Sequence, residues 1–261
     1  MLDQITPVIL TFNESPNICR TLDQLSWAND IVIVDSHSTD DTVELIKKYP
    51  QVRLFQREFD SHANQWNYSI NETAIKTDWI LALDADHVLS KSVVNELDIL
   101  QSTPEIDAYK IDFQYCILGK TLSGALYPPV IVLYRKGKAS YIQDGHTQRV
   151  QIDGDVGSLS ELIFHDDRKP LSSWLQAQDR YMQLEAELLS SKNWGSLGFA
   201  DKIRRLVIIA PIAVFFYCLL VKRGLFDGRA GLYYALQRSL AEAILSLRIM
   251  EMSISKKLYR H

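Results

Sequence analysis

The stretch DWILALDADHVLS, residues 78–90, places two carboxylates, Asp84 and Asp86, directly after an apolar run. The run has the continuous apolar character of a parallel strand that is buried on both faces. A bare D-x-D pair is a weak signal, because such pairs are common in solvated turns. Its position after a buried strand favours a functional anchor here.

Short apolar runs alternate with helical patterns through the first half of the chain. The predicted strands are Ile5–Thr11, Ile31–Asp35, Val52–Phe55 and Trp79–Leu83. The predicted helices between them are Ser15–Leu25, Thr39–Lys48 and Ala63–Ile75. This alternation predicts an α/β fold with a mostly parallel central sheet, flanking helices and right-handed crossovers.

The pattern changes after Asp107. Further strands are predicted at Ala108–Tyr115, Val130–Arg135 and Gln148–Ile152, in a more antiparallel portion. Beyond Pro170 the pattern is helical: Ser172–Ser191 is amphipathic, and the apolar residues of a last long helix also share one face. That face carries Leu236, Leu240, Ala243, Leu247, Met250 and Ile254. We predict a catalytic domain at 1–170, with a nucleotide-sugar half at 1–107 and an acceptor half at 108–170. A helical region follows at 171–261.

Residues 206–221, LVIIAPIAVFFYCLLV, form an uncharged segment with basic residues on both sides. It is shorter than the ~20 residues of a membrane span and contains Pro211. We predict that the region 203–223 associates with a membrane as an interfacial or re-entrant element. The alternative is a buried helical hairpin or a contact within a homo-oligomer.

The bulk composition excludes several classes of protein. The 261 residues carry a net charge of −4, which argues against a nucleic-acid binder. Three scattered cysteines fit a reducing compartment better than a disulfide framework or a zinc site. The N-terminal residues lack the pattern of a signal peptide, so we expect a cytoplasmic location.

Polar residues follow several of the predicted strands, and the carboxyl ends of parallel strands share one edge of a sheet. Thr11 to Glu14, Asp35, and Asp84 to Asp86 would meet at that edge. In an extended backbone Asp84 and Asp86 point to the same face. Their mutual repulsion favours a bound divalent cation, which would also bridge a diphosphate. Helix capping explains Ser38 to Asp41. It leaves Asp35 facing the cleft, where its carboxylate would accept hydrogen bonds from a base or ribose.

Three ordered motifs together resemble family 2 glycosyltransferases of the GT-A fold. They are TPVILTFNES at 6–15, IVIVDSHSTDDTVEL at 31–45 and DWILALDADHVLS at 78–90. The pattern is similar to that of bacterial lipopolysaccharide-core β-glucosyltransferases. The resemblance implies a nucleotide-sugar donor, usually linked to UDP, a Mg²⁺ or Mn²⁺ ion, and inversion at the anomeric carbon. Near the C-terminus, RGLFDGRAGLYYALQRSLAE resembles a family segment whose glycines allow a tight connection between elements.

The resemblance also implies roles for individual residues. The residues expected to contact the donor are Thr11, Asn13, Glu14, Asp35, Gln65, Asn67, Asp84 and Asp86. Asp86 would bind the metal beside the diphosphate, and His165 would complete the metal shell. His87 replaces a glutamate that is common in the family, and we expect it to have a structural role. Arg168 and Lys169 are expected either to neutralise phosphate or to lie in a solvated loop.

The general base is less well defined, because Thr147 stands where the family pattern has glutamate. An inverting transfer needs a carboxylate or imidazole to take the proton of the acceptor hydroxyl. Asp144, next to Gly145, is the first candidate and His146 the second. Asp155 and Glu161 are alternatives.

The function expected from these residues is an inverting, metal-dependent hexosyltransferase of cell-envelope polysaccharide or lipopolysaccharide biosynthesis. It would act on a glycan or lipid-linked acceptor at the cytoplasmic face of a bacterial inner membrane. One alternative acceptor is polyprenyl phosphate. Alternatives of another class are a nucleotidyltransferase and a non-catalytic scaffold that binds nucleotide sugars.

Overall fold

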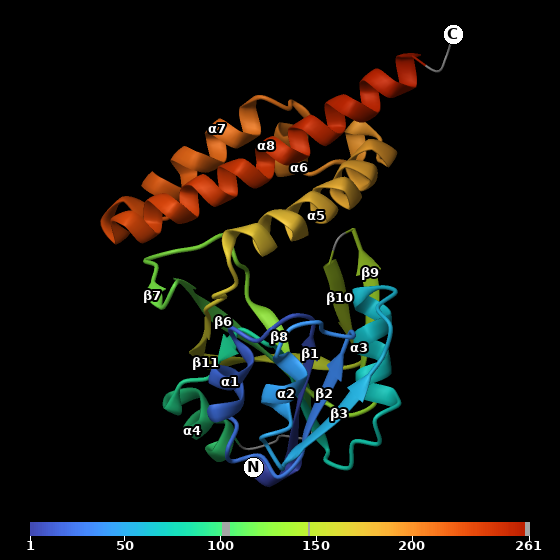
Figure 1. Cartoon of the computed structure of the whole chain (residues 1–261), viewed down its shortest axis with the longest axis vertical. Helices are drawn as coiled ribbons and strands as arrows, with labels where there is room; N and C mark the ends of the chain where they lie inside the picture. The colour runs from blue at the N-terminus through green and yellow to red at the C-terminus, as the bar shows by residue number, and fades with distance from the viewer. Residues whose placement is uncertain (101–104, 146, 259–261) are drawn as a thin grey trace. The chain divides into compact units, whose positions relative to one another are not determined.

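The computed structural model describes residues 1–100, 105–145 and 147–258 (Figure 1). The chain divides into two compact units. The first unit comprises Met1–Gly119 and Tyr127–Lys169, and the second comprises Lys120–Leu126 and Pro170–His261.

The first unit is built on a mixed sheet with strand order β3-β2-β1-β4-β8-β6-β11-β5. Its N-terminal strands are β1 (Ile5–Thr11), β2 (Ile31–Asp35), β3 (Val52–Gln56) and β4 (Trp79–Asp84). These four run parallel, whereas β8 is antiparallel to both β4 and β6. The later strands are β5 (His87–Val88), β6 (Ile106–Ile117), β8 (Val130–Arg135) and β11 (Asp155–His165). The predicted mostly parallel sheet is confirmed.

Helices and 3₁₀ turns connect these strands. They are η1 (Leu2–Gln4), α1 (Ile18–Asp23), α2 (Thr42–Ile46), α3 (His62–Asn71) and α4 (Lys91–Ile99). Ser61 and Ser90 cap α3 and α4, because each hydroxyl accepts a backbone N–H from the first turn. The second helix begins at Thr42 rather than at the predicted Thr39. The Asp40 carboxylate accepts the N–H groups of Thr42 and Ser15 and thereby holds residues 38–41 as a loop.

Alternating side chains of the parallel strands build a core on each face of the sheet. Ile9 and Ile33 pack in the core cluster that includes the α1 residues Ile18 and Leu22. The alternate residues of the same strands, such as Val8, pack in the cluster that includes α3 residues. Burial on both faces explains why the apolar runs of β1, β2 and β4 are continuous.

Two elements of the first unit were not predicted. Strand β9 (Ala139–Asp144) pairs with β10 (Thr147–Ile152) in a separate two-stranded hairpin. Strand β11 pairs in parallel with β6 through register shifts. Its sequence, DVGSLSELIFH, mixes polar and apolar residues, so it lacks the apolar continuity that revealed the other parallel strands.

The second unit is helical apart from the two-residue β7 (Lys120–Thr121). Its helices are α5 (Leu171–Ser191), α6 (Phe199–Arg205), α7 (Ile209–Phe216) and α8 (Arg229–Leu258). The shorter turns are η2 (Trp194–Ser196), η3 (Tyr217–Val221) and η4 (Gly224–Asp227). Met182, Leu189 and Leu245 lie in a buried core cluster. Arg204 is clamped between Glu185 and Glu242.

The connection between the apolar segment and α8 is as tight as its glycines suggested. A Cβ added at Gly231 would lie 1.9 Å from the carbonyl oxygen of Gly224, so no larger residue fits there. The side chain of Asp227 accepts the backbone N–H of Ser123 at 2.9 Å. Among the residues that the structure describes, no helix has the length and apolar content needed to cross a membrane.

Candidate active site

The candidate site begins where β4 ends. Strand β4 stops at Asp84 and residues 85 and 86 form a turn, so the extended geometry predicted for the two carboxylates does not hold. Asp84 is half exposed, whereas the turn carries Asp86 inward. The hydroxyl of Thr21 on α1 donates to the carbonyl of Ala85 at 2.7 Å and fixes the turn.

The structure brings Asp86 and His165 together, as predicted. His165 Nε2 lies 3.1 Å from Asp86 Oδ2. The two residues are far apart in sequence, and β5 joins them in space because His87 pairs with His165 across the β5–β11 ladder. The backbone N–H of Asp166 also donates to the carbonyl of Asp86, at 3.1 Å.

This pair shifts the protonation of both groups. Burial by itself would raise the pKa of Asp86, but the charge and hydrogen bond of His165 hold it well below its usual range. Burial by itself would lower the pKa of His165, but the adjacent Asp86 carboxylate raises it above its ordinary value. The free site therefore favours a carboxylate beside an imidazolium.

His87 completes a cluster in which the candidate ligand atoms of Asp86, His87 and His165 lie within 4.8 Å of one another. Its Nδ1 accepts the backbone N–H of Asp84 at 3.0 Å. A neutral imidazole with an accepting Nδ1 carries its proton on Nε2. That nitrogen is buried 3.6 Å from Asp84 Oδ2, with no closer hydrogen-bond partner in the described part of the chain.

This tautomer affects which residues would hold a metal. A protonated Nε2 has no lone pair for a cation, and burial lowers the pKa of His87 and keeps the ring neutral. Asp86 and His165 converge without this obstacle. Their oxygen and nitrogen atoms fit a divalent cation, and an imidazole ligand favours Mn²⁺ over Mg²⁺.

Glu14 and Lys169 form a second buried pair at the same edge. Lys169 Nζ lies 2.6 Å from Glu14 Oε1, and Asn17 donates to Glu14 Oε2 at 2.9 Å. Burial raises the pKa of Glu14 to about 7; Lys169 opposes the shift and the nearby charge of Asp86 adds to it. Lys169 is therefore not part of a solvated loop.

Arg168 is also held in place. Its guanidinium contacts the buried carboxylate of Asp166, which Arg20 pairs from the other side at 2.8 Å. Asp166 Oδ1 further accepts the N–H of Gly119. This arrangement fastens residues 166–169 beside α1, and it corresponds to neither of the two roles expected for Arg168.

Thr11, Asn13 and Asp35 belong to one hydrogen-bond network. The Thr11 hydroxyl donates to Asp35 Oδ1 at 2.9 Å, and the Ser38 N–H donates to Asp35 Oδ2 at 2.9 Å. Ser38 Oγ accepts the N–H of Asn13, while Asn13 Oδ1 accepts that of Thr39. The expectation that Asp35 faces a cleft is wrong for this structure, because its exposed fraction is 0%.

Gln65 and Asn67 sit on α3 with different surroundings. Gln65 is buried, donates to Ser36 Oγ at 3.0 Å and accepts from Arg57. Both amide atoms of Asn67 bond the backbone of Tyr141, at 2.8 and 2.9 Å. Asn67 thus fastens β9 to α3, and its contact with a donor stays a prediction.

The candidate bases are spread over the β9–β10 hairpin and β11. Asp144 ends β9 in an ion pair with Arg149, and His146 lies outside the described residues. Asp155 begins β11, whereas His165 ends it. Ten residues of strand place them roughly 30 Å apart, which removes Asp155 as a base for a reaction beside His165. No printed interaction joins Asp144 to the Asp86–His165 pair within the described ranges, so its role remains a prediction.

Sequence reasoning missed the surroundings of His165. The rings of Tyr115 and Tyr127 lie 4.7 and 4.9 Å from its imidazole, and Phe113 stacks beside His87 at 4.6 Å. The alternation of aromatic residues at 113 and 115 was a signal, since such residues share one strand face. Nothing in the sequence indicated that Tyr127 would join them.

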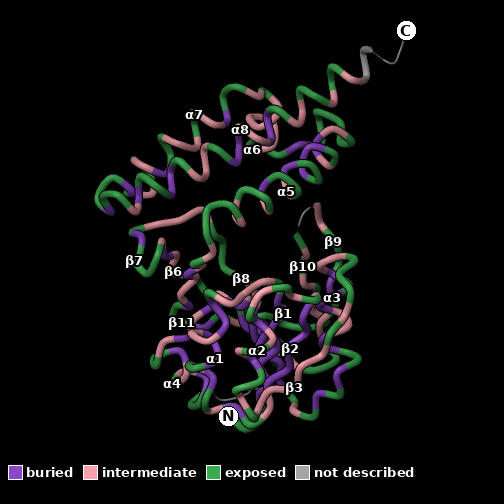
Figure 2. Tube along the Cα trace, viewed as in Figure 1, coloured by how far each residue is buried: buried purple, intermediate pink, exposed green. Residues whose placement is uncertain are grey.

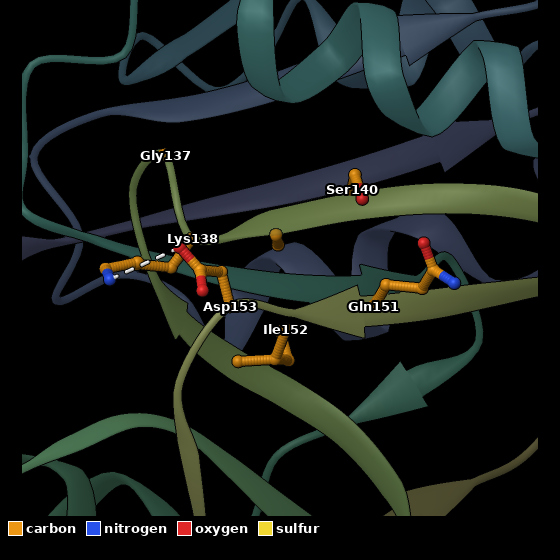
Figure 3. A pocket seen from close by; sticks show the side chains of 7 residues that line it. Gly137, Lys138, Ser140, Gln151, Ile152 and Asp153 are labelled. Atoms are coloured by element: carbon orange, nitrogen blue, oxygen red, sulfur yellow. Dashed lines mark ion pairs between the residues drawn. The ribbon is translucent and has the colours of Figure 1, made fainter.

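A separate shallow pocket lies on the β9–β10 hairpin (Figure 3). It is lined by Lys138, Ser140, Gln151 and Asp153, with Lys138 Nζ 3.6 Å from Asp153. It contains none of the predicted site residues.

The fold and the strand-end cluster define a GT-A-type α/β protein. Residues 6–100 match the sequence model of glycosyl transferase family 2, so this segment belongs to that family and the resemblance seen in the motifs is confirmed.

Individual relatives extend the match. The SPbeta prophage-derived glycosyltransferase SunS of Bacillus subtilis (strain 168) is 30% identical over 184 residues, which are 67% of this chain and 42% of SunS. The lipopolysaccharide core biosynthesis glycosyltransferase LpsC of Rhizobium meliloti (strain 1021) is 23% identical over 87% of this chain and 84% of LpsC. The chain thus spans less than half the length of SunS.

One solved structure shares the fold across both chains. S. aureus TarS 1–349, crystallised in complex with UDP-GlcNAc, superposes with a TM-score of 0.51 and 15% sequence identity. The match covers 97% of this chain and 92% of the TarS chain.

Proposed function

We propose that this protein is a metal-dependent, inverting glycosyltransferase that uses a nucleotide-sugar donor. The observation that carries the proposal is the convergence of Asp86 and His165, 3.1 Å apart, at the carboxyl edge of a sheet within the family 2 segment. Ligands of open α/β sheets bind at this edge.

UDP is the proposed nucleotide, since the fold neighbour TarS was crystallised with UDP-GlcNAc. Thr11, Asn13 and Asp35 would line the nucleoside side of the pocket, together with Gln65. Glu14 and Asp84 lie nearer the diphosphate in this proposal. Asp35 retains acceptor capacity for the donor, because a carboxylate offers about four lone-pair sites.

Asp86 and His165 are the proposed metal ligands, with Mn²⁺ or Mg²⁺ bound. Such an ion supplies positive charge that stabilises the departing diphosphate. The protein's own cation at this edge is Lys169, which Glu14 holds in place. A bound diphosphate would compete with Glu14 for this ammonium group.

The transfer itself needs a base. In the proposed step, the base takes the proton of the acceptor hydroxyl as its oxygen bonds to the anomeric carbon. The bond from that carbon to the diphosphate breaks, and the nucleoside diphosphate leaves with inversion. Asp144 is the proposed base and His146 its alternative. A polyprenyl phosphate acceptor is already ionised and would need little base catalysis.

The acceptor is proposed to be a glycan or a lipid-linked glycan of the bacterial cell envelope. The match to LpsC, whose name refers to lipopolysaccharide core biosynthesis, supports this class. The reaction would take place at the cytoplasmic face of the inner membrane.

The test is thermal stabilisation by UDP, GDP and CMP, each with and without Mn²⁺. Saturation at ~100 times Kd adds about 2.7 kcal/mol to the unfolding free energy, a rise of several degrees in Tm. We expect UDP with Mn²⁺ to stabilise the wild type and Asp153→Asn, a control at an exposed carboxylate. Asp86→Asn should abolish the effect.

The outcomes separate the alternatives. Stabilisation by another nucleotide would change the donor, and no stabilisation by any nucleotide would refute the proposed pocket. A turnover assay on glycan and polyprenyl-phosphate acceptors then identifies the products. Release of UDP supports transfer, release of pyrophosphate indicates a nucleotidyltransferase, and binding without turnover indicates a scaffold.

A further inference from the structure

The outer side of α7 and the turn that follows it present an apolar surface in the second unit. We define this α7 face by Ile208, Ile212, Phe216, Leu220, Leu225 and Phe226, all of which are exposed. Ile208 is 73% exposed and Phe226 is 82% exposed. Figure 2 shows the exposed colour recurring along α7.

The inner side of α7 is packed normally. Ala210 and Cys218 are buried, and Ser239 of α8 donates to the carbonyl of Pro211 at 2.9 Å. Pro211 lies in the first turn of α7, where a missing N–H costs no helical hydrogen bond. One side of α7 is therefore docked on α8, and its opposite side is apolar without a partner in the unit.

The charges around this face are all of one sign. Residues 202–226 contain five cations and no acidic residue, although the chain as a whole is acidic at −4. Arg204 is neutralised by Glu185 and Glu242. Lys222 and Arg223 follow the apolar segment directly and form no ion pair among the described residues.

The dimensions exclude a transmembrane arrangement for this element. Helix α7 has 8 residues, or about 12 Å of helix, whereas a bilayer core is about 30 Å thick. An apolar helix side bordered by cations is instead typical of an element that lies in the plane of a membrane surface. Anionic headgroups would meet the cations while the apolar residues enter the boundary of the acyl chains.

We propose that the α7 face binds the surface of an anionic phospholipid bilayer. A second copy of the chain fits less well, because two such faces would bring cations together without any acidic partner between residues 202 and 226. The inference deepens the proposed function, since a lipid-linked acceptor would lie in the same surface.

The experiment is co-sedimentation of the full chain with vesicles of phosphatidylcholine, with and without phosphatidylglycerol. We expect binding only to the anionic vesicles, weakened by salt. Lys222→Gln combined with Arg223→Gln should reduce the partition coefficient about 30-fold, at ~1 kcal/mol for each cation. Ile212→Gln combined with Phe216→Gln should reduce it roughly 100-fold.

Matched controls lie on α5 of the same unit. Arg180→Gln and Leu184→Gln also change an exposed cation and an exposed apolar residue, and they should leave binding unchanged. Circular dichroism melting of every variant shows whether the helices still form.

Three results would overturn the proposal. They are equal binding to both vesicle types, no binding by the wild type, and a concentration-dependent dimer that the Ile212 and Phe216 changes dissociate. The assay contains no donor or acceptor. Loss of nucleotide binding with intact vesicle binding would therefore refute the proposed function alone.

Discussion

Replacing Glu14 by glutamine should flatten the pH dependence of stability of the first unit. Burial raises the pKa of Glu14 from 4.5 to about 7. Because this folded-state pKa lies above the unfolded one, the native state binds an extra proton between these values. The unfolding free energy contributed by Glu14 is therefore fully present at low pH and is lost as pH rises through about 7.

The size of this effect follows from the shift. Each unit is worth about 1.4 kcal/mol, so the upper limit is about 3 kcal/mol, and the residual exposure of Glu14 reduces our expectation to about 2 kcal/mol. Lys169→Met should act in the opposite direction. It leaves a buried carboxylate unpaired at high pH, which costs about 3 kcal/mol, and it costs less where Glu14 is protonated.

The assay is urea unfolding near pH 5 and near pH 8, followed by hydrogen exchange in peptides from β1 and β4. These strands report on the first unit separately from the helical second unit. The stability difference between wild type and Glu14→Gln should shift by about 2 kcal/mol in favour of the variant as pH rises. An unchanged difference would refute the assignment of this proton to Glu14.

Three further predictions concern the site. In the Mn²⁺–UDP complex, electron spin-echo spectra should show one coordinated imidazole that survives His87→Leu and disappears in His165→Leu; two imidazoles would contradict the His87 tautomer. Since a protonated imidazole cannot ligate, Mn²⁺ affinity should rise with pH up to the raised pKa of His165, and calorimetry giving a flat profile would exclude His165 as a ligand. Asn67→Ala should cost ~1–3 kcal/mol in urea unfolding by orphaning the backbone of Tyr141, with an unchanged donor KM; a raised KM at unchanged stability would instead support the predicted donor contact.

The apolar pattern misled where it had two physical explanations. The stripe through Leu236, Leu240 and Leu247 lies on one side of α8, as the spacing predicts, yet these residues are exposed. Spacing identifies a helix face but not what covers it. The side of α8 that is buried carries Ala235, Ala241 and Leu245 instead.

The sequence by itself determined the parallel half of the fold and the position of the acidic strand end. Continuous apolar runs can be buried only between two layers, so β1 and β2 were predicted with their observed bounds, and β4 to within one residue. The same motifs identified the family, which the match over residues 6–100 confirms.

Only the tertiary structure decided how the site is assembled. The distance between Asp86 and His165 depends on the β5–β11 pairing, a contact between residues far apart in the chain. The tautomer of His87 depends on a single backbone N–H, and the pKa of Glu14 depends on burial and on Lys169. Local sequence specifies which groups are present, but proton positions and charge pairing arise from the fields and distances that folding creates.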